Sequence, residues 1–175
     1  MIGVRSAKVY PTPMHEPGQH QPTDRPVGRI LGLDVGDRRV GVAVSDELGL
    51  TAQPVLTLVR KNRRQDLGSL ARLIRKYGCA NVVVGNPLYM SGDVSPQALK
   101  AQDFAHALHL QTGVEVTLWD ERLSTTEAHR HLEAAGRIPS DRRAVIDQVA
   151  AVLILQSFLD SRSAPSPAGV EQRLP

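Results

Sequence analysis

The chain has 175 residues, of which 41% are hydrophobic, so it can form one domain with a sizeable core but not two full ones. Lysine and arginine number 21 against 18 aspartates and glutamates, and the formal net charge of +3 allows a nucleic-acid partner without requiring one. Cys79 is the only cysteine, which excludes an intrachain disulfide and a cysteine-based zinc site.

The two ends of the chain differ in composition from its middle. Residues 1–28 contain five prolines without helical or strand periodicity, and residues 161–175 are rich in Ser, Pro, Ala and Gly. Both ends are therefore expected to be disordered, with the folded domain at residues 29–160. No continuous stretch approaches the roughly 18 apolar residues of a membrane span, and we expect a cytoplasmic protein without a membrane partner.

The first half of the domain predicts three strands. Residues 30–35 and 40–45 are joined by a turn at residues 36–39, and residues 50–58 follow. Pro54 lacks a backbone N–H and demotes part of this third strand toward a sheet edge. Short connections between consecutive strands indicate an antiparallel meander.

The pattern then alternates between helices and strands. Apolar residues at helical spacing run from Arg64 to Gly78, and the non-alternating residues 81–85 predict a central strand covered on both faces. Ser95 and Pro96 predict the start of a second helix, which is followed by a strand at residues 114–120.

The last part of the domain predicts two further helices. A capping box at residues 124–127 begins a helix that runs to Gly136, and residues 143–159 form a helix so apolar that it should be buried on more than one side. The order βββαβαβαα predicts an α/β fold, a five-stranded mixed sheet with helices on both faces.

Three acidic residues occupy positions where an apolar side chain would be expected. Asp34 lies inside the first strand, Glu121 follows the fifth, and Asp147 interrupts the last helix. A buried carboxylate is costly unless it is paired or coordinates a metal, and sites in open α/β sheets lie at the carboxyl ends of strands. Convergence of the three would form a site for Mg²⁺ or Mn²⁺, which could hydrolyse a phosphodiester.

Each carboxylate also has a simpler interpretation. Asp34 could accept hydrogen bonds from backbone amides of the turn at Gly36, and Asp147 could form an i, i+4 ion pair with Arg143. Glu121 could be a solvated strand end. The coincidence of all three favours the metal site over these separate explanations.

Basic residues gather in short runs, most densely at residues 60–64. Such runs bind phosphates, although they are also typical of a solvated surface. Aromatic residues make up only 3% of the chain, so recognition of backbone and shape is favoured over base stacking. The candidates for contact with nucleic acid are Arg38, Arg39, Asn86, Arg122, Arg142 and Arg143.

Four segments, at residues 34–43, 85–92, 120–125 and 147–151, resemble in order and spacing the YqgF family of Holliday-junction-resolvase-like proteins. The resemblance covers about residues 28–162. It implies an RNase H-like fold and a cytoplasmic nuclease that processes the 5′ end of precursor 16S rRNA, with resolution of four-way DNA junctions as an alternative.

Carried over by position, the resemblance implies that Asp34, Glu121 and Asp147 are the catalytic residues and hold Mg²⁺ or Mn²⁺. Asn86 and Tyr89 differ from the residues most common in the family. Two other classes stay open: a non-catalytic RNA-binding factor, and an ATP-handling protein of the actin and sugar-kinase group, which would need a second domain. The chain is expected to be a monomer or a homodimer.

Overall fold

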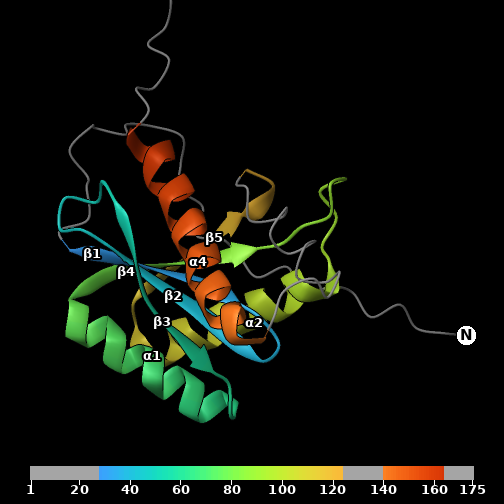
Figure 1. Cartoon of the computed structure of the whole chain (residues 1–175), viewed down its shortest axis with the longest axis horizontal. Coiled ribbons are helices and arrows are strands. Elements are labelled where there is room, and N and C mark those ends of the chain that lie inside the picture. The colour runs from blue at the N-terminus through green and yellow to red at the C-terminus, as the bar shows by residue number, and fades with distance from the viewer. Residues whose placement is uncertain (1–27, 124–139, 164–175) are drawn as a thin grey trace, which may run out of the picture.

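The computed structural model describes residues 28–123 and 140–163, and the predicted helix at residues 124–136 lies outside them, as do residues 1–27 and 164–175. Residues 161–163, which were expected in a disordered tail, instead continue the last helix. All the other predicted elements are present in the predicted order (Figure 1). They are β1 (Arg29–Val35), β2 (Arg39–Ser45), β3 (Ala52–Val59), α1 (Arg63–Tyr77), β4 (Cys79–Asn86), α2 (Pro96–Thr112), β5 (Glu115–Asp120) and α4 (Ser140–Ser163). The structure adds a short 3₁₀ helix that was not predicted, η1 (Glu121–Leu123).

The five strands form one mixed sheet in the order β3-β2-β1-β4-β5. β2 is antiparallel to both β1 and β3, whereas β4 is parallel to both β1 and β5, which is the RNase H-like arrangement. Because β1, β4 and β5 are parallel, they end at the same edge of the sheet, at Val35, Asn86 and Asp120. We call this edge the carboxyl rim, and β2 begins and β3 ends at it as well.

The edge position of β3 confirms the expectation from Pro54. Pro54 lies in the outermost strand, where a missing N–H costs no hydrogen bond to a further strand. The register shifts beside it, since Val42 is opposite Leu56 but Ala43 is opposite Pro54. One residue, Val55, is therefore extra on β3 and forms a bulge.

Both helices that precede β4 and β5 begin and end at the residues that cap them. Asn62 accepts a hydrogen bond from the Gln65 amide at the start of α1, and Gly78 ends the helix in the left-handed conformation. Ser95 accepts from the Ala98 amide at the start of α2, with Pro96 next to it.

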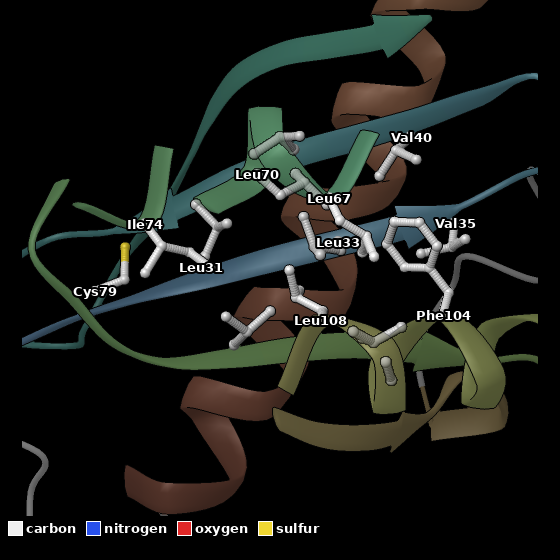
Figure 2. Close-up of a cluster of buried hydrophobic side chains, with 14 of the residues drawn as sticks. Leu31, Leu33, Val35, Val40, Leu67, Leu70, Ile74, Cys79, Phe104 and Leu108 are labelled. Atoms are coloured by element: carbon white, nitrogen blue, oxygen red, sulfur yellow. The ribbon is translucent and has the colours of Figure 1, made fainter. Parts of the chain in front are cut away.

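The sheet is covered by α1 and α2 on one face and by α4 on the other (Figure 1). Side chains alternate along β1, so Leu31, Leu33 and Val35 pack against α1 and α2 (Figure 2). Ile30 packs against α4 instead. The same alternation places Asp34 on the α4 face of the sheet, away from the larger apolar cluster.

Glycines on this face let α4 approach the strands closely. A Cβ on Gly32 would lie 2.6 Å from the Leu155 Cβ, and a Cβ on Gly41 would collide with the Asp147 carbonyl group. The helix backbone therefore rests on the strand backbone at these positions, which fixes where the residues of α4 lie over the sheet.

Helix α4 differs from two expectations. Its outer face is not buried by the described residues, since Val145 and Val149 are 60% and 40% exposed. The segment Arg142–Ser163 is long and apolar enough to cross a membrane, with a mean hydropathy of 1.4, although no such stretch was expected. Polar residues interrupt the apolar ones along this segment, so its high mean hydropathy is not visible as a continuous apolar stretch. The helix packs the fully buried Ile154 against the sheet, as a core helix does.

Candidate active site

Asp34 and Asp147 are brought together through Gly41. Asp34 on β1 is opposite Gly41 on β2, and the backbone of Asp147 lies directly over Gly41. Both carboxylates are buried, with 9% and 8% of the residue exposed. Because Gly41 has no side chain, the backbone of Asp147 can lie against it, so that both aspartates adjoin the same glycine on the α4 face of the sheet.

Glu121 reaches the same place from the end of β5. Its Oε1 atom lies over Gly85, where a Cβ would collide with it. The pairing of Leu33 with Val84 places Gly85 beside Asp34. Glu121 is 2% exposed, so its interpretation as a solvated strand end is wrong. All three predicted acidic residues thus gather at the carboxyl rim, under α4.

Asp147 is held by an arginine from the sheet. The Arg39 Nε atom donates to Asp147 Oδ2 across 2.5 Å, and both side chains are largely covered. Among the described residues Asp147 has its ion pair with Arg39 and none with Arg143, whose buried Nε has no hydrogen-bond partner there. The Gly36 amide, for its part, donates to the Arg39 carbonyl and closes the turn that follows Asp34.

The chemistry of these three residues fits a hard divalent cation, since carboxylate oxygens are the ligands that such ions prefer. All three are buried, and two of them, Asp147 and Glu121, lie over the glycines Gly41 and Gly85 of the sheet. The described side chains do not form a ready-made metal site, because no group of three or more His, Cys, Asp and Glu residues among them has suitable geometry. Arg39 supplies the positive charge next to Asp147 in this structure. Metal binding would require Asp147 to exchange that guanidinium for the ion.

Asp120, which precedes Glu121, is paired with Arg122. The Arg122 Nε lies 3.0 Å from both carboxylate oxygens, and this side-chain hydrogen bond is the main reason why the pKa of Asp120 is lowered from its usual range. Arg122 also donates to the Met90 carbonyl at 3.4 Å. The pair therefore ties the end of β5 to the loop after β4.

The other predicted nucleic-acid contacts are spread along the carboxyl rim. Arg38 and Arg142 are exposed, and Asn86 accepts a hydrogen bond from Gln102 at 3.2 Å. Arg39 and Arg122 lie at the rim too, but each has a carboxylate partner within it. Sequence reasoning proposed Arg39 for phosphate contact and missed its role opposite Asp147, because the two residues are 108 positions apart.

Arg60 was not among the predicted site residues, and it supports the turn between β1 and β2 that lies next to the site. Its Nη1 atom donates to the Gly36 carbonyl at 2.8 Å, and its Nε lies 3.3 Å from the buried Asp66 carboxylate. Its guanidinium also lies 5.1 Å from the centre of the Phe104 ring. Arg60 therefore fixes the turn between Asp34 and Arg39, and its place at the start of a basic run gave no sign of this.

A family model described as RuvX, Holliday junction resolvase, matches residues 28–161. A protein of Syntrophus aciditrophicus named "Putative pre-16S rRNA nuclease" is 48% identical over 135 residues, which cover 77% of this chain and 90% of the relative. Relatives of the same name in Lachnospira eligens and Clostridioides difficile are 45% and 46% identical, and the matches cover 98% and 94% of their lengths.

Solved structures show more distant likenesses. RuvC of Thermus thermophilus in complex with a Holliday junction substrate aligns with a TM-score of 0.47 and 14% identity, over 78% of this chain and 96% of that one. The fowlpox virus resolvase with Holliday junction DNA aligns with a TM-score of 0.44 and 13% identity, over 76% and 97%. At these scores the likeness says nothing about the activity of this chain.

Proposed function

Because the chain belongs to the RuvX family, whose model is described as a Holliday junction resolvase, we propose that it is a nuclease that hydrolyses phosphodiester bonds of nucleic acid. Family membership confirms the resemblance to YqgF proteins on which the sequence interpretation rested. The observation that supports the catalytic assignment is the gathering of Asp34, Glu121 and Asp147 over Gly41 and Gly85 at the carboxyl rim.

Asp34, Glu121 and Asp147 would hold Mg²⁺ or Mn²⁺. When bound, the ions would lower the pKa of the attacking water and stabilise the charge on the entering and leaving oxygens. The residues of this chain supply the rest. The glycine-lined floor leaves room for the three carboxylates, and α4 covers them and restricts access of bulk water. Arg39 balances the charge of Asp147 before the ion enters.

The substrate that fits the curated relatives is precursor 16S rRNA, and we propose processing of its 5′ end, with the cytoplasm as the compartment. Resolution of branched DNA is the second candidate, because the family model carries that description. A metal site that acts on phosphodiesters does not by itself distinguish ribose from deoxyribose.

Cleavage of both substrates by the purified protein tests the proposal. We expect cleavage of a precursor 16S leader with Mg²⁺ or Mn²⁺ and none with EDTA. Asp34→Asn should abolish cleavage, by at least 100-fold, while it leaves leader binding and the thermal midpoint nearly intact, because it removes one negative oxygen without changing the shape of the side chain. Faster cleavage of a four-way DNA junction than of the leader would favour the second candidate.

Asp147→Asn and Asp160→Asn form a matched pair on α4. Asp147 lies on the buried side of α4, at the site, whereas Asp160 is exposed 13 residues further along the helix. Only the first substitution should lower cleavage. If Asp34→Asn and Asp147→Asn both cleave as the parent does, the catalytic assignment is wrong; if no variant or parent cleaves but all bind the leader, the chain is a binding factor.

A further inference from the structure

The basic run at residues 60–64 divides into two halves in the structure. Arg60 and Arg63 have side-chain partners in the domain: Arg60 donates to Asp66 and to the Gly36 carbonyl, and Arg63 donates to Asp103 at 2.8 Å on the surface. Lys61 and Arg64 are exposed, and among the described residues their side chains have no hydrogen bond or ion pair. Two of the four cations in the run are therefore without a side-chain partner among the described residues.

These two cations lie at a cavity between β3 and α1. The cavity has a volume of about 730 Å³, and its walls include Leu58 and Val59 from the end of β3. Its cationic side chains are Lys61, just before α1, and Arg64 and Arg72 from the first three turns of α1. A volume of this order accommodates a nucleotide-sized group.

The charge of the cavity is strongly one-sided. Asp66 is the acidic residue in its lining, and it is 2% exposed. Its oxygens already accept from the Lys61 amide at 3.0 Å and from the Arg60 guanidinium at 3.3 Å. The cavity thus presents the charges of Lys61, Arg64 and Arg72 to whatever enters it, and a phosphate diester is the complementary group.

The cavity meets the carboxyl rim on the α1 face of the sheet, whereas the three carboxylates lie on the α4 face. Val59, in its wall, is opposite Arg39 in the sheet, and Arg39 contacts Asp147. The Arg60 amide donates to the Arg38 carbonyl at 2.9 Å, which joins the exposed Arg38 to the same edge. A nucleic-acid chain that passes over the three carboxylates would therefore reach the cavity by crossing the carboxyl rim past Arg38 to the α1 face.

We propose that the β3–α1 cavity is a second backbone-binding site, which holds phosphates of the nucleic acid several nucleotides away from the cleaved bond. This inference rests on the proposed nuclease function and names where its substrate leaves the site. Lys61 and Arg64 carry the binding, and Arg72 also lines the cavity, where its Nη2 donates to the Ser69 hydroxyl at 2.9 Å.

The test compares two double substitutions, one at each end of α1. Lys61→Ala with Arg64→Ala removes two charges at the cavity, and Arg75→Ala with Lys76→Ala removes two exposed charges from the last turn of α1. Both are made in the Asp34→Asn background and measured without metal, by fluorescence anisotropy of a labelled 20-nucleotide leader RNA at several salt concentrations. Binding is thereby separated from cleavage.

We expect the cavity pair to weaken binding about tenfold and to reduce the slope of log affinity against log salt by about 1.4, because two phosphate contacts to a single strand are lost. The control pair should change neither. A six-nucleotide RNA, too short to span both sites, should bind the cavity variant and its parent equally. If the cavity variant fails to fold, as judged by its thermal midpoint, Arg64→Gln alone should give about half the change in slope.

Equal loss of affinity from the cavity pair and the control pair, or no loss from either, would overturn the inference, and so would an equal loss with the six-nucleotide RNA. These outcomes are distinct from a failure of the nuclease proposal. A parent protein that cleaves the leader while the cavity pair binds normally refutes the second site alone, and a non-cleaving parent whose binding depends on the cavity refutes the nuclease alone.

Discussion

The Nε of Arg39 donates to Oδ2 of Asp147 across 2.5 Å and joins the start of β2 to the middle of α4. Arg39 therefore occupies the position next to Asp147 in which the proposed function requires a divalent cation. The pair lets a buried carboxylate persist without metal, since an ionised group in the interior needs an opposite charge.

Removal of the Arg39 guanidinium should show how much it stabilises the buried Asp147 carboxylate. Arg39→Gln leaves the Asp147 carboxylate buried without its counter-charge, so we expect the free energy of unfolding to fall by about 1–3 kcal/mol in urea denaturation without metal. Addition of Mn²⁺ should restore more stability to this variant than to the parent, because the ion can replace the lost charge. Arg29→Gln is the control, since its partner Glu47 is 81% exposed, and it should change stability by less than about 0.5 kcal/mol. Equal effects of both substitutions would show that the Arg39 pair is no more than a surface contact.

Gly41→Ala should separate α4 from the sheet. The added Cβ would collide with the Asp147 carbonyl, a backbone group that can move only with the helix. We expect a loss of about 2 kcal/mol or more in unfolding free energy. Gly68→Ala on α1 has no atom within 4 Å of the new Cβ, and it should instead stabilise the protein by about 0.5–1 kcal/mol. A Gly41→Ala protein as stable as the parent would contradict the close approach of α4.

Gly85→Ala should affect activity more than stability. Its Cβ would overlap the Glu121 carboxylate and lie 2.6 Å from the Ile154 Cδ1, and both are ends of side chains that can rotate away. We expect cleavage to fall at least tenfold with a thermal midpoint lowered by only a few degrees, because the displaced group is the proposed metal ligand. Val83→Ala, two residues earlier on the same face of β4, should show the reverse: a lower midpoint with cleavage retained. A fall in the midpoint without loss of cleavage for Gly85→Ala would remove Glu121 from the site.

Cys79 should be unreactive in the folded protein. Burial raises the pKa of its thiol to about 11, so almost no thiolate is present at pH 8. Reaction with a chromogenic disulfide reagent at pH 8 should be at least 100-fold slower in the native protein than in 6 M guanidinium chloride. A rate in the native protein close to the unfolded one would show that β4 opens readily at its first residue.

The same pKa gives a direction for the pH dependence of stability. The thiol is protonated in the folded state up to a higher pH than in the unfolded state, where it titrates near 9. Its contribution is therefore fully present below pH 9 and is lost as the pH rises toward 11. Urea midpoints between pH 8 and 11 should fall for the parent and fall less for Cys79→Ala; an identical decline in both would assign it to other groups.

The sequence by itself determined the element order, the mixed sheet with β3 at its edge, and the three acidic residues that mark the carboxyl rim. These follow from local physics: hydrophobic period, helix caps at Asn62 and Ser95, and the cost of placing Asp34 in an apolar strand. The resemblance to the family motifs implies a catalytic role for the same three residues, and it does so only through the order and spacing of the motifs.

The tertiary structure alone decided which charges meet. Asp147 pairs with Arg39 rather than Arg143. In the run at residues 60–64, two cations form ion pairs and two have no side-chain partner among the residues that the structure describes. Contacts between residues 40 or 108 positions apart depend on how α1, α2 and α4 sit on the sheet, and neither spacing nor composition encodes that placement. The packing of glycines and apolar side chains sets the positions of the helices and strands, and these positions decide which distant charges come into contact. Long-range ion pairs therefore appear only once the chain has folded.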